Sequence, residues 1–592
     1  MKISHNKLII TLLCISSILL LMQALIFSVF SQDILSLQLP AVNGSKERTI
    51  ILLSTLSECF VFFLLAASFV LLIYFERDKI KIVIFTHSNT LLFSIFVIYF
   101  IFRLTFLFFG YDIADGYEKT AIYFFETHNI KAFNARNIPY PLFILISTLI
   151  YPSFSIVSLF HSLLGMLTAY FIYLSFIKIN KMTVPTFFNE KKWIICLIGY
   201  SIIILYLFST QRIWLEQKLR PEIGTQFLLS AIIYLLLRLI EKPSCISYLL
   251  ITGINLFALH YQPKTLVFAI FCIIATTVFF CVKIYSDENT LKSKILRTAV
   301  IIGFFAAYFA LINICTKIID ENKIDTKKFA YSTVFVSIMN LIDIEVQHDI
   351  KKENAKYPKE LLIIWHNFYK NVAHKYSNMN ISKFDCILYS TQYTELLNIT
   401  QNVYGGTDIH YLNNFLVYYC VKSALSHPFA YAYKVLKVFF KSFALLFDSF
   451  KNPLFFQDIN NKGLANNIIT MQERGGGILQ NNFCNTITNI LNKKHFYCTF
   501  NFFPMNFVYL ATIICFPVWI AVSIIIFCKR RKNKALFIYT LMSILTYFLL
   551  HAVTALTTFE YNRYNFELFP VILISCVLCI QTCFLNIKKQ RL

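Results

Sequence analysis

The sequence predicts an all-α polytopic membrane protein with about twelve transmembrane helices and one mostly helical extracytoplasmic loop domain. Of the 592 residues, 57% are hydrophobic and 14% are charged, whereas a soluble chain of this length carries far more charge. The hydrophobic residues come in runs of about 20, the length that a helix needs to cross about 30 Å of hydrocarbon. The runs do not alternate between apolar and polar residues, so a membrane β-barrel is not expected.

The apolar runs divide the chain into four regions. We expect an N-terminal hairpin of two spans over residues 1–81 and a transmembrane core with a large outer loop, 110–153, over residues 82–316. An extracytoplasmic domain over 317–504 and three C-terminal spans with a basic cytoplasmic tail over 505–592 complete the chain. The individual spans are expected near residues 8–30, 49–75, 82–109, 154–176, 194–210, 222–240, 245–260, 265–283, 297–316, 505–528, 535–556 and 566–585.

Two segments between the spans differ from simple connecting loops. The segment from Pro139 to Pro152 is apolar but only about 14 residues long, which predicts an interfacial or re-entrant helix and not a full span. The stretch 317–504 is polar and rich in Asn, Lys and Tyr, so it is the candidate for a folded domain in water. Within it, helices are expected near residues 357–376 and 411–426.

Residues 429–450 are amphipathic, with Lys434, Lys437 and Lys441 on one face. This pattern is typical of a helix that lies along a membrane surface. The net charge of +23 is ascribed to cytoplasmic flanking residues and to the lysine-rich loop domain, which could meet anionic lipid or lipid phosphate. Nucleic-acid binding is not expected.

Basic residues in the short breaks between spans indicate how the chain is oriented. Every second break is basic, which places these breaks and both chain termini in the cytoplasm. The outer loop 110–153 and the domain 317–504 then lie on the non-cytoplasmic side. The basic residues on which this inference depends are Arg77, Lys79, Lys81, Lys178, Lys181, Lys191, Lys192, Lys242, Lys283, Lys292, Lys294, Arg297, Lys529, Lys534, Lys588, Lys589 and Arg591.

Of the sixteen cysteines, twelve fall in or beside the apolar runs, and the others are Cys386, Cys420, Cys484 and Cys498. No pair of these four has the spacing of metal ligands, so no metal site is expected from them. A disulfide between Cys484 and Cys498 remains open, because the domain lies on the side where disulfides can form.

The outer loops contain the residues that could take part in catalysis or ligand binding. Asp112 and Asp115 follow directly after the end of a span. A carboxylate at a membrane interface could act as a general base, because partial burial raises its pKa toward a useful range. The alternative is structural, since Asp115 also suits the N-cap of a helix expected over 116–127.

A second outer loop carries six charged or amide groups between two apolar spans. Glu216 and Arg220 are four residues apart and can pair on a helix. The arginines of this loop could hold a phosphate bidentately, whereas the alternative is a solvated loop of ordinary charges. The six residues are Gln211, Arg212, Glu216, Lys218, Arg220 and Glu222.

Two further outer turns carry one candidate cation each. Lys264, in the turn that begins at His260, could face an anionic ligand or extend toward lipid headgroups. Arg563 is a second phosphate candidate, and pairing with Glu560 or Glu567 is its structural alternative. Because charges beside a membrane are costly and often functional, the convergence of four such loops on one face predicts a lipid-facing active site.

At these residues the sequence resembles the GT-C superfamily of integral membrane glycosyltransferases, and within it the protein mannosyltransferase and aminoarabinose transferase branch. The resemblance covers most of residues 82–585 and departs from the family in the additional hairpin 8–75 and in the absence of an Asp-Glu doublet. The residues that carry the resemblance are Asp112, Asp115, Tyr117, Ala121, Pro139, Tyr140, Pro141, Arg563, Tyr564 and Pro570.

The resemblance implies an inverting transfer of a hexosyl or pentosyl group from a polyprenyl-phosphate-linked donor to a glycolipid, polysaccharide or protein acceptor. Asp112 or Asp115 would be the catalytic base. No cofactor would be required, although carboxylates of the second loop could bind a divalent metal. Donor-phosphate binding is expected of Arg220, Lys264 and Arg563, and supporting or acceptor contacts are expected of Glu216, Glu222, His260, Glu560 and Tyr564.

The resemblance favours a bacterial inner membrane over the endoplasmic reticulum, with polyprenyl-phosphate sugar, membrane lipid and the glycan, lipid or protein acceptor as partners. Two other functions fit about twelve spans with a large outer loop. One is an O-antigen polymerase or ligase-like protein, and the other is a transporter or flippase of lipid-linked sugar. A transporter is expected to have charged residues or broken helices at mid-membrane.

Overall fold

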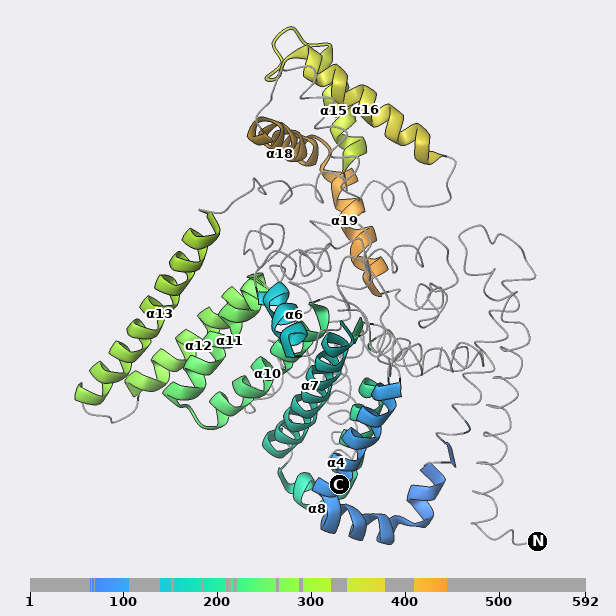
Figure 1. Ribbon diagram of the computed structural model, residues 1–592, viewed down its shortest axis with the longest axis vertical. Coiled ribbons are helices and arrows are strands. Elements are labelled where there is room, and N and C mark those ends of the chain that lie inside the picture. Colours follow the sequence, from blue (N-terminus) through green and yellow to red (C-terminus); the bar gives the residue numbers. More distant parts are fainter. Residues whose placement is uncertain are drawn as a thin grey trace, which may run out of the picture. The chain divides into compact units, whose positions relative to one another are not determined.

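The computed structural model describes two compact units, which we call the membrane unit (residues 64–320) and the loop unit (residues 338–443). Within the described residues every regular element is a helix and none is a strand, which confirms the all-α class for this part of the chain (Figure 1). The described residues are 64, 67–68, 70–105, 139–150, 154–183, 185–208, 212, 215–216, 221–261, 266–286, 291–320, 338–377 and 409–443.

The membrane unit has four described helices that are long and apolar enough to cross a bilayer, namely α4, α7, α10 and α13. Shorter apolar segments lie in α8, α11 and α12. This supports the prediction of a membrane protein. Some of the expected spans lie outside the described ranges. The helices are α4 (Arg77–Thr105), α6 (Pro139–Ile150), α7 (Phe154–Thr183), α8 (Pro185–Leu207), α10 (Glu222–Glu241), α11 (Cys245–Tyr261), α12 (Leu266–Ser286) and α13 (Leu291–Asp320).

Helices α10 and α6 begin where the sequence predicts, whereas α8 begins nine residues before the span expected over 194–210. The span expected over 222–240 corresponds to α10, which begins at Glu222 directly after Pro221, a residue suited to a helix start. The apolar segment after Pro139 forms the helix α6 of 12 residues, which is too short to cross hydrocarbon, as expected. Proline and charge therefore determine where these helices begin and end.

Helix α4 is kinked at His87, whose backbone angles of φ −124° and ψ 25° lie outside the helical region. The hydroxyl of Tyr200 on α8 donates a hydrogen bond of 3.0 Å to the carbonyl oxygen of Ser88, beside the kink. A carbonyl near an interrupted helical ladder needs such a partner in a membrane. The neighbouring helix supplies it here.

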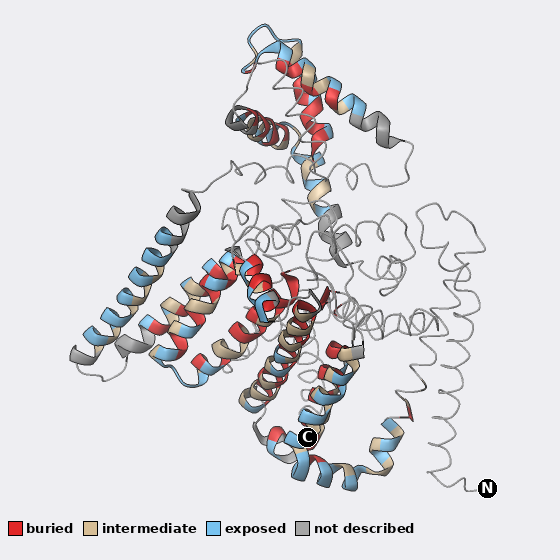
Figure 2. Ribbon diagram, in the orientation of Figure 1, coloured by how far each residue is buried: buried red, intermediate tan, exposed pale blue. Residues whose placement is uncertain are grey.

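Helix α7 lies against α4, α6, α8 and α10, and α10 in turn lies against α11. In Figure 2 many residues of α7, α10 and α11 are coloured as buried, whereas the described residues of α13 are coloured as exposed or intermediate. On α13, Phe309 is 59% exposed and Leu311 is 60% exposed. Apolar side chains exposed along a span of this length are expected to face lipid.

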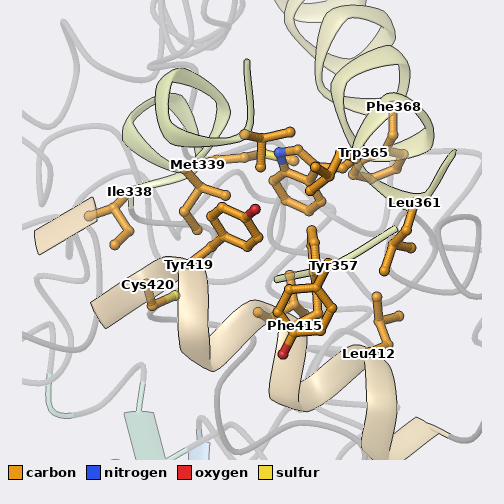
Figure 3. Close-up of a cluster of buried hydrophobic side chains, with 14 of the residues drawn as sticks. Ile338, Met339, Tyr357, Leu361, Trp365, Phe368, Leu412, Phe415, Tyr419 and Cys420 are labelled. Carbon is orange, nitrogen blue, oxygen red and sulfur yellow. The ribbon is translucent and has the colours of Figure 1, made fainter. Parts of the chain in front are cut away.

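The loop unit consists of four described helices around an aromatic core (Figure 3). Trp365, Phe415 and Tyr419 are each at most 1% exposed, and the rings of Phe415 and Tyr419 lie 4.9 Å apart. The helices expected near 357–376 and 411–426 are confirmed, and the amphipathic segment begins as a helix where predicted. The helices are α15 (Met339–Ile350), α16 (Lys359–Ser377), α18 (Ile409–Ser426) and α19 (Pro428–Phe443).

A polar cluster joins α15 to α18 beside this core. Asp349, 3% exposed, accepts a hydrogen bond of 2.8 Å from the hydroxyl of Tyr419 and pairs with Lys422 at 2.6 Å. Lys422 also pairs with Glu345 at 3.2 Å. Burial alone would raise the pKa of Asp349, but the hydrogen bonds from Lys422 and Tyr419 outweigh it and hold the pKa below its ordinary value.

This lowered pKa predicts an acid-sensitive loop unit. A carboxylate with a depressed native pKa stabilises the fold above its unfolded pKa of about 3.9, and this contribution is lost as the pH falls through the native pKa. At neutral pH, Asp349→Asn is expected to accelerate opening of the core. In acid, the ratio of the opening rate of the variant to that of the wild type should approach one. In acid the wild-type carboxyl is protonated and resembles the amide.

Cys420 provides the measurement, because it is 8% exposed and burial raises the pKa of its thiol to about 12. Such a thiol reacts only when the core opens. Dithiodipyridine modification of the Cys420 peptide, followed by mass spectrometry over a pH series, reports the opening rate. Glu353→Gln, at an exposed carboxylate after α15, is the matched control. A rate ratio for Asp349→Asn that stays constant into acid would contradict the prediction.

Several expectations fall outside the described residues. These are the first span, most of the second, the outer loop 110–138, the three C-terminal spans over 505–592, and the cysteines 386, 484 and 498.

Candidate functional site

A network of buried charges joins the end of α4 to the segment between α8 and α10. The side chains of Arg103, Arg212 and Glu216 are each 0% exposed. Arg103 Nε donates to Glu216 Oε2 at 2.8 Å, and Arg212 Nη2 pairs with the other carboxylate oxygen, Oε1. One carboxylate therefore bridges two guanidinium groups. Buried ion pairs require this kind of mutual satisfaction, because an uncompensated charge in a low dielectric is very costly.

Tyrosine and serine hydroxyls complete the surroundings of the bridging carboxylate. The Tyr99 hydroxyl donates to Glu216 Oε2 at 2.8 Å and accepts from Arg212 Nη2 at 2.9 Å. Arg103 Nε also donates to Ser162 Oγ at 3.1 Å, in the first turns of α7. The network thus ties α4 and α7 to the segment that carries Glu216.

Arg212 lies between two aromatic rings at the end of α8. Its guanidinium carbon is 4.8 Å from the ring centre of Tyr99 and 4.6 Å from that of Tyr206. Its Nη1 donates to the carbonyl oxygen of Leu207 at 2.9 Å, where the helix leaves carbonyls without internal partners. Burial opposes the charged form, but Glu216 outweighs it and the pKa of Arg212 lies above its ordinary value. Arg212 is therefore a permanent buried cation.

His161 connects this segment to the short helix α6. Its Nδ1 lies 3.1 Å from the backbone oxygen of Glu216, and because a carbonyl only accepts, Nδ1 carries the hydrogen. Its Nε2 lies 3.3 Å from the Tyr140 hydroxyl, and the two rings stack at an interplanar angle of 11°. The Tyr140 ring also meets the Tyr261 ring edge-on, 5.7 Å away. The ends of α4, α6, α8 and α11 and the first half of α7 therefore converge on one site.

A glycine on α7, which has no side chain, leaves room for the ion pair. A Cβ atom at Gly165 on α7 would overlap the guanidinium of Arg212 and the carboxylate of Glu216. Both groups are fixed by partners on other elements, so neither can move aside without losing hydrogen bonds. Glycine at this position lets α7 approach the charges closely.

Gly165→Ala is therefore expected to lower the free energy of unfolding by about 1–3 kcal/mol, the usual cost of overpacking. Thermal unfolding of the full chain in detergent micelles measures the effect. Gly303→Ala on α13 is the matched control, since nothing lies within 4 Å of its added Cβ and alanine favours a helix. Equal transition temperatures for the two variants would show that Arg212 and Glu216 are not packed against α7.

The structure places three of the predicted site residues. Glu216 is the centre of the network, and its partners are Arg103 and Arg212, whereas the partner expected from spacing, Arg220, lies outside the described residues. Glu222 is buried, 3% exposed, at the first residue of α10. His260 belongs to a different environment, because it is exposed and its Nε2 lies 2.7 Å from the hydroxyl of Tyr308 on α13.

The other predicted site residues lie outside the described ranges: Asp112, Asp115, Arg220, Lys264, Glu560, Arg563 and Tyr564.

Sequence reasoning missed several members of the network, above all Arg103, Tyr99 and His161. Arg103 had a detectable signal, because it is a lone charge near the end of an apolar run and such charges are rare unless paired. The two aromatic residues had none, since tyrosine and histidine are ordinary near span ends. Among the described residues, no group of three or more His, Cys, Asp and Glu side chains could hold a metal ion.

Comparison of the chain with protein-family models, with curated proteins and with solved structures finds no match. The residues of the site and the membrane unit that holds them are therefore the evidence for function.

Proposed function

We propose that this protein is a membrane glycosyltransferase that moves a sugar from a polyprenyl-phosphate-linked donor to an acceptor on the non-cytoplasmic face. The observation that carries the proposal is the buried network of Arg103, Arg212 and Glu216. In the sequence, Glu216 lies four residues before the candidate phosphate ligand Arg220, and Arg103 lies nine residues before Asp112. The network thus pairs two residues whose sequence neighbours have the required chemistry.

In this scheme Asp112 or Asp115 removes the proton from an acceptor hydroxyl or amine. The acceptor atom forms a bond to the anomeric carbon of the sugar from the face opposite the phosphate, so the configuration inverts. The bond between that carbon and the phosphate oxygen breaks, and the electron pair leaves with the polyprenyl phosphate. The proton remains on the aspartate until it passes to solvent.

Arg220, Lys264 and Arg563 are the proposed ligands of the departing phosphate, whose charge must be neutralised for it to leave. Arg220 is four residues beyond Glu216, and Lys264 is three residues beyond Tyr261, which contacts Tyr140 in the site. Both residues are therefore within four residues, in the sequence, of a side chain that belongs to the site. Arg103, Arg212 and Glu216 act as positioning residues in this proposal.

Glu222, His260, Glu560 and Tyr564 are proposed to support the acceptor. No cofactor is required by the scheme. A divalent metal, if one is used, would not be held by Glu216, because both oxygens of its carboxylate already accept from guanidinium groups. The proposed location is a bacterial inner membrane, with both termini in the cytoplasm.

A flippase for lipid-linked sugars is the second candidate, although this network lies near the ends of the spans and not at mid-membrane, where a transporter is expected to carry its charges. Buried arginine and glutamate near the ends of spans are also found along transport pathways. The two candidates differ in chemistry, since a flippase moves the intact donor and breaks no glycosidic bond.

The test uses purified full-length protein in proteoliposomes with polyprenyl-phosphate donors that carry a radiolabelled sugar. We expect label to pass to an added glycolipid or glycan acceptor and polyprenyl phosphate to accumulate in equal amount. Movement of intact donor between leaflets without release of polyprenyl phosphate would reject the transferase and support the flippase. Neither activity with any donor in a panel of sugars would reject both.

A further inference from the structure

Helix α19 of the loop unit packs one face against its unit and exposes another. Tyr431 packs against the aromatic core of the unit. Phe429 is 89% exposed, Tyr433 is 69% exposed and Leu436 is 53% exposed, and their spacing of four and three residues places them on one face. Lys434 is partly buried, with its Nζ 5.8 Å from the centre of the Tyr431 ring, and two further lysines follow in the sequence of the helix at positions 437 and 441.

Exposed apolar side chains occur on α18 as well as on α19. Val421 is 54% exposed and Leu425 is 76% exposed, and with Phe429 they keep a spacing of four residues. Two backbone hydrogen bonds cross the junction, from His427 N to Ser423 O and from Tyr431 N to His427 O, whereas Pro428 has no N–H to donate. Exposed apolar side chains therefore lie on both sides of the junction between the two helices, and we call Val421, Leu425, Phe429, Tyr433 and Leu436 the α18–α19 stripe.

A stripe of this length on a water-exposed unit requires a cover, since exposed apolar patches usually mark an interaction surface. Its composition favours a bilayer interface. Aromatic side chains suit the headgroup boundary, and the adjacent lysines suit anionic headgroups. A protein partner would more often be met by a stripe with few lysines, because lysine is depleted at protein interfaces.

The chain also keeps this stripe close to a membrane. Helix α13, which contains the spanning segment Lys294–Leu311, ends at Asp320, and the loop unit begins at Ile338. The 17 residues from 321 to 337 reach at most about 60 Å when extended. Tethering of this kind gives the loop unit a high effective concentration at the bilayer surface, so even a weak contact would be occupied.

We propose that the α18–α19 stripe inserts into the interfacial layer of the bilayer that holds the protein's own spans, with Lys437 and Lys441 against anionic headgroups. The loop unit is then a membrane-seated domain and not one that projects freely into water. This inference does not depend on the proposed glycosyl transfer, because it uses only exposure, charge and chain length.

The test places the photoreactive residue benzoylphenylalanine at position 429 or 433 of the full-length chain in nanodiscs of zwitterionic and anionic lipid. Ile363 on α16, which is 46% exposed, is the matched control position. We expect lipid adducts at 429 and 433, identified by mass spectrometry, at several times the yield at 363. Protection of Cys420 from thiol reagents confirms that each variant is folded.

Equal lipid yields at the three positions would overturn the proposal. Adducts between two copies of the chain, or with another segment of the same chain, would overturn it in favour of a protein cover. A second variant tests the charge. The double substitution Lys437→Gln and Lys441→Gln should reduce the share of anionic lipid among the adducts at 429, and an unchanged share would reject the headgroup contact.

Discussion

Glu216→Ala is expected to be the most damaging single substitution in the membrane unit, with a loss of about 3–5 kcal/mol in the free energy of unfolding. The reason is that one carboxylate compensates two arginines that are 0% exposed. Without it, two like charges remain buried side by side, and the hydroxyl of Tyr99 loses its acceptor. Glu216→Gln should cost less, because an amide oxygen still accepts hydrogen bonds although its charge is gone.

Thermal or denaturant unfolding of the full chain in detergent micelles measures this loss. Glu241→Ala is the matched control, since it removes a carboxylate that pairs with Lys178 at 2.6 Å where both side chains remain partly exposed. A pair of that kind contributes about 1 kcal/mol or less. If the two alanine variants unfold alike, the network around Glu216 does not hold the membrane unit together.

Asp115→Asn or Asp112→Asn is expected to reduce sugar transfer by about 10²–10⁴-fold, the usual contribution of a general base. An amide cannot take up the proton of the acceptor. The variant should therefore transfer sugar more slowly while its affinity for the donor stays the same. The measurement is the initial rate of label transfer from the polyprenyl-phosphate donor, with unfolding recorded in parallel. The residue with the larger loss in kcat is the base.

Asp78→Asn is the control for this pair of variants. Asp78 is an exposed carboxylate in the first turn of α4, whereas Asp112 and Asp115 follow the last turn of α4 in the sequence. Its transfer rate should match that of the wild type. Full activity in both the Asp112 and Asp115 variants would remove the proposed mechanism. The two predictions are also separable, since Glu216 variants should lose stability and transfer together, whereas the aspartate variants should lose transfer alone.

The sequence predicted the helices well wherever an apolar run met a clear boundary. Helix α10 begins at Glu222 and α6 spans the short segment after Pro139, because the length of a run and its flanking prolines are local properties. The amphipathic helix α19 was equally predictable from its lysine spacing. These features need no knowledge of distant contacts.

The partners in the site were much harder to predict. Spacing along one helix suggested that Glu216 pairs with Arg220, whereas the structure pairs it with Arg212 and with Arg103, which is 113 residues away. The choice depends on how α4 and α7 pack, and hydrophobic periodicity does not specify which helices become neighbours. The contacts of Arg212 with the two tyrosines could not be predicted for the same reason.

The close approach at Gly165 has an evolutionary consequence. A side chain at that position and a guanidinium at position 212 compete for the same space, so neither can be altered without regard to the other. In any lineage that descends from this chain, loss of the glycine should be accompanied by a shorter residue at 212, and an alignment that shows both sites drifting independently would reveal a rearranged bundle.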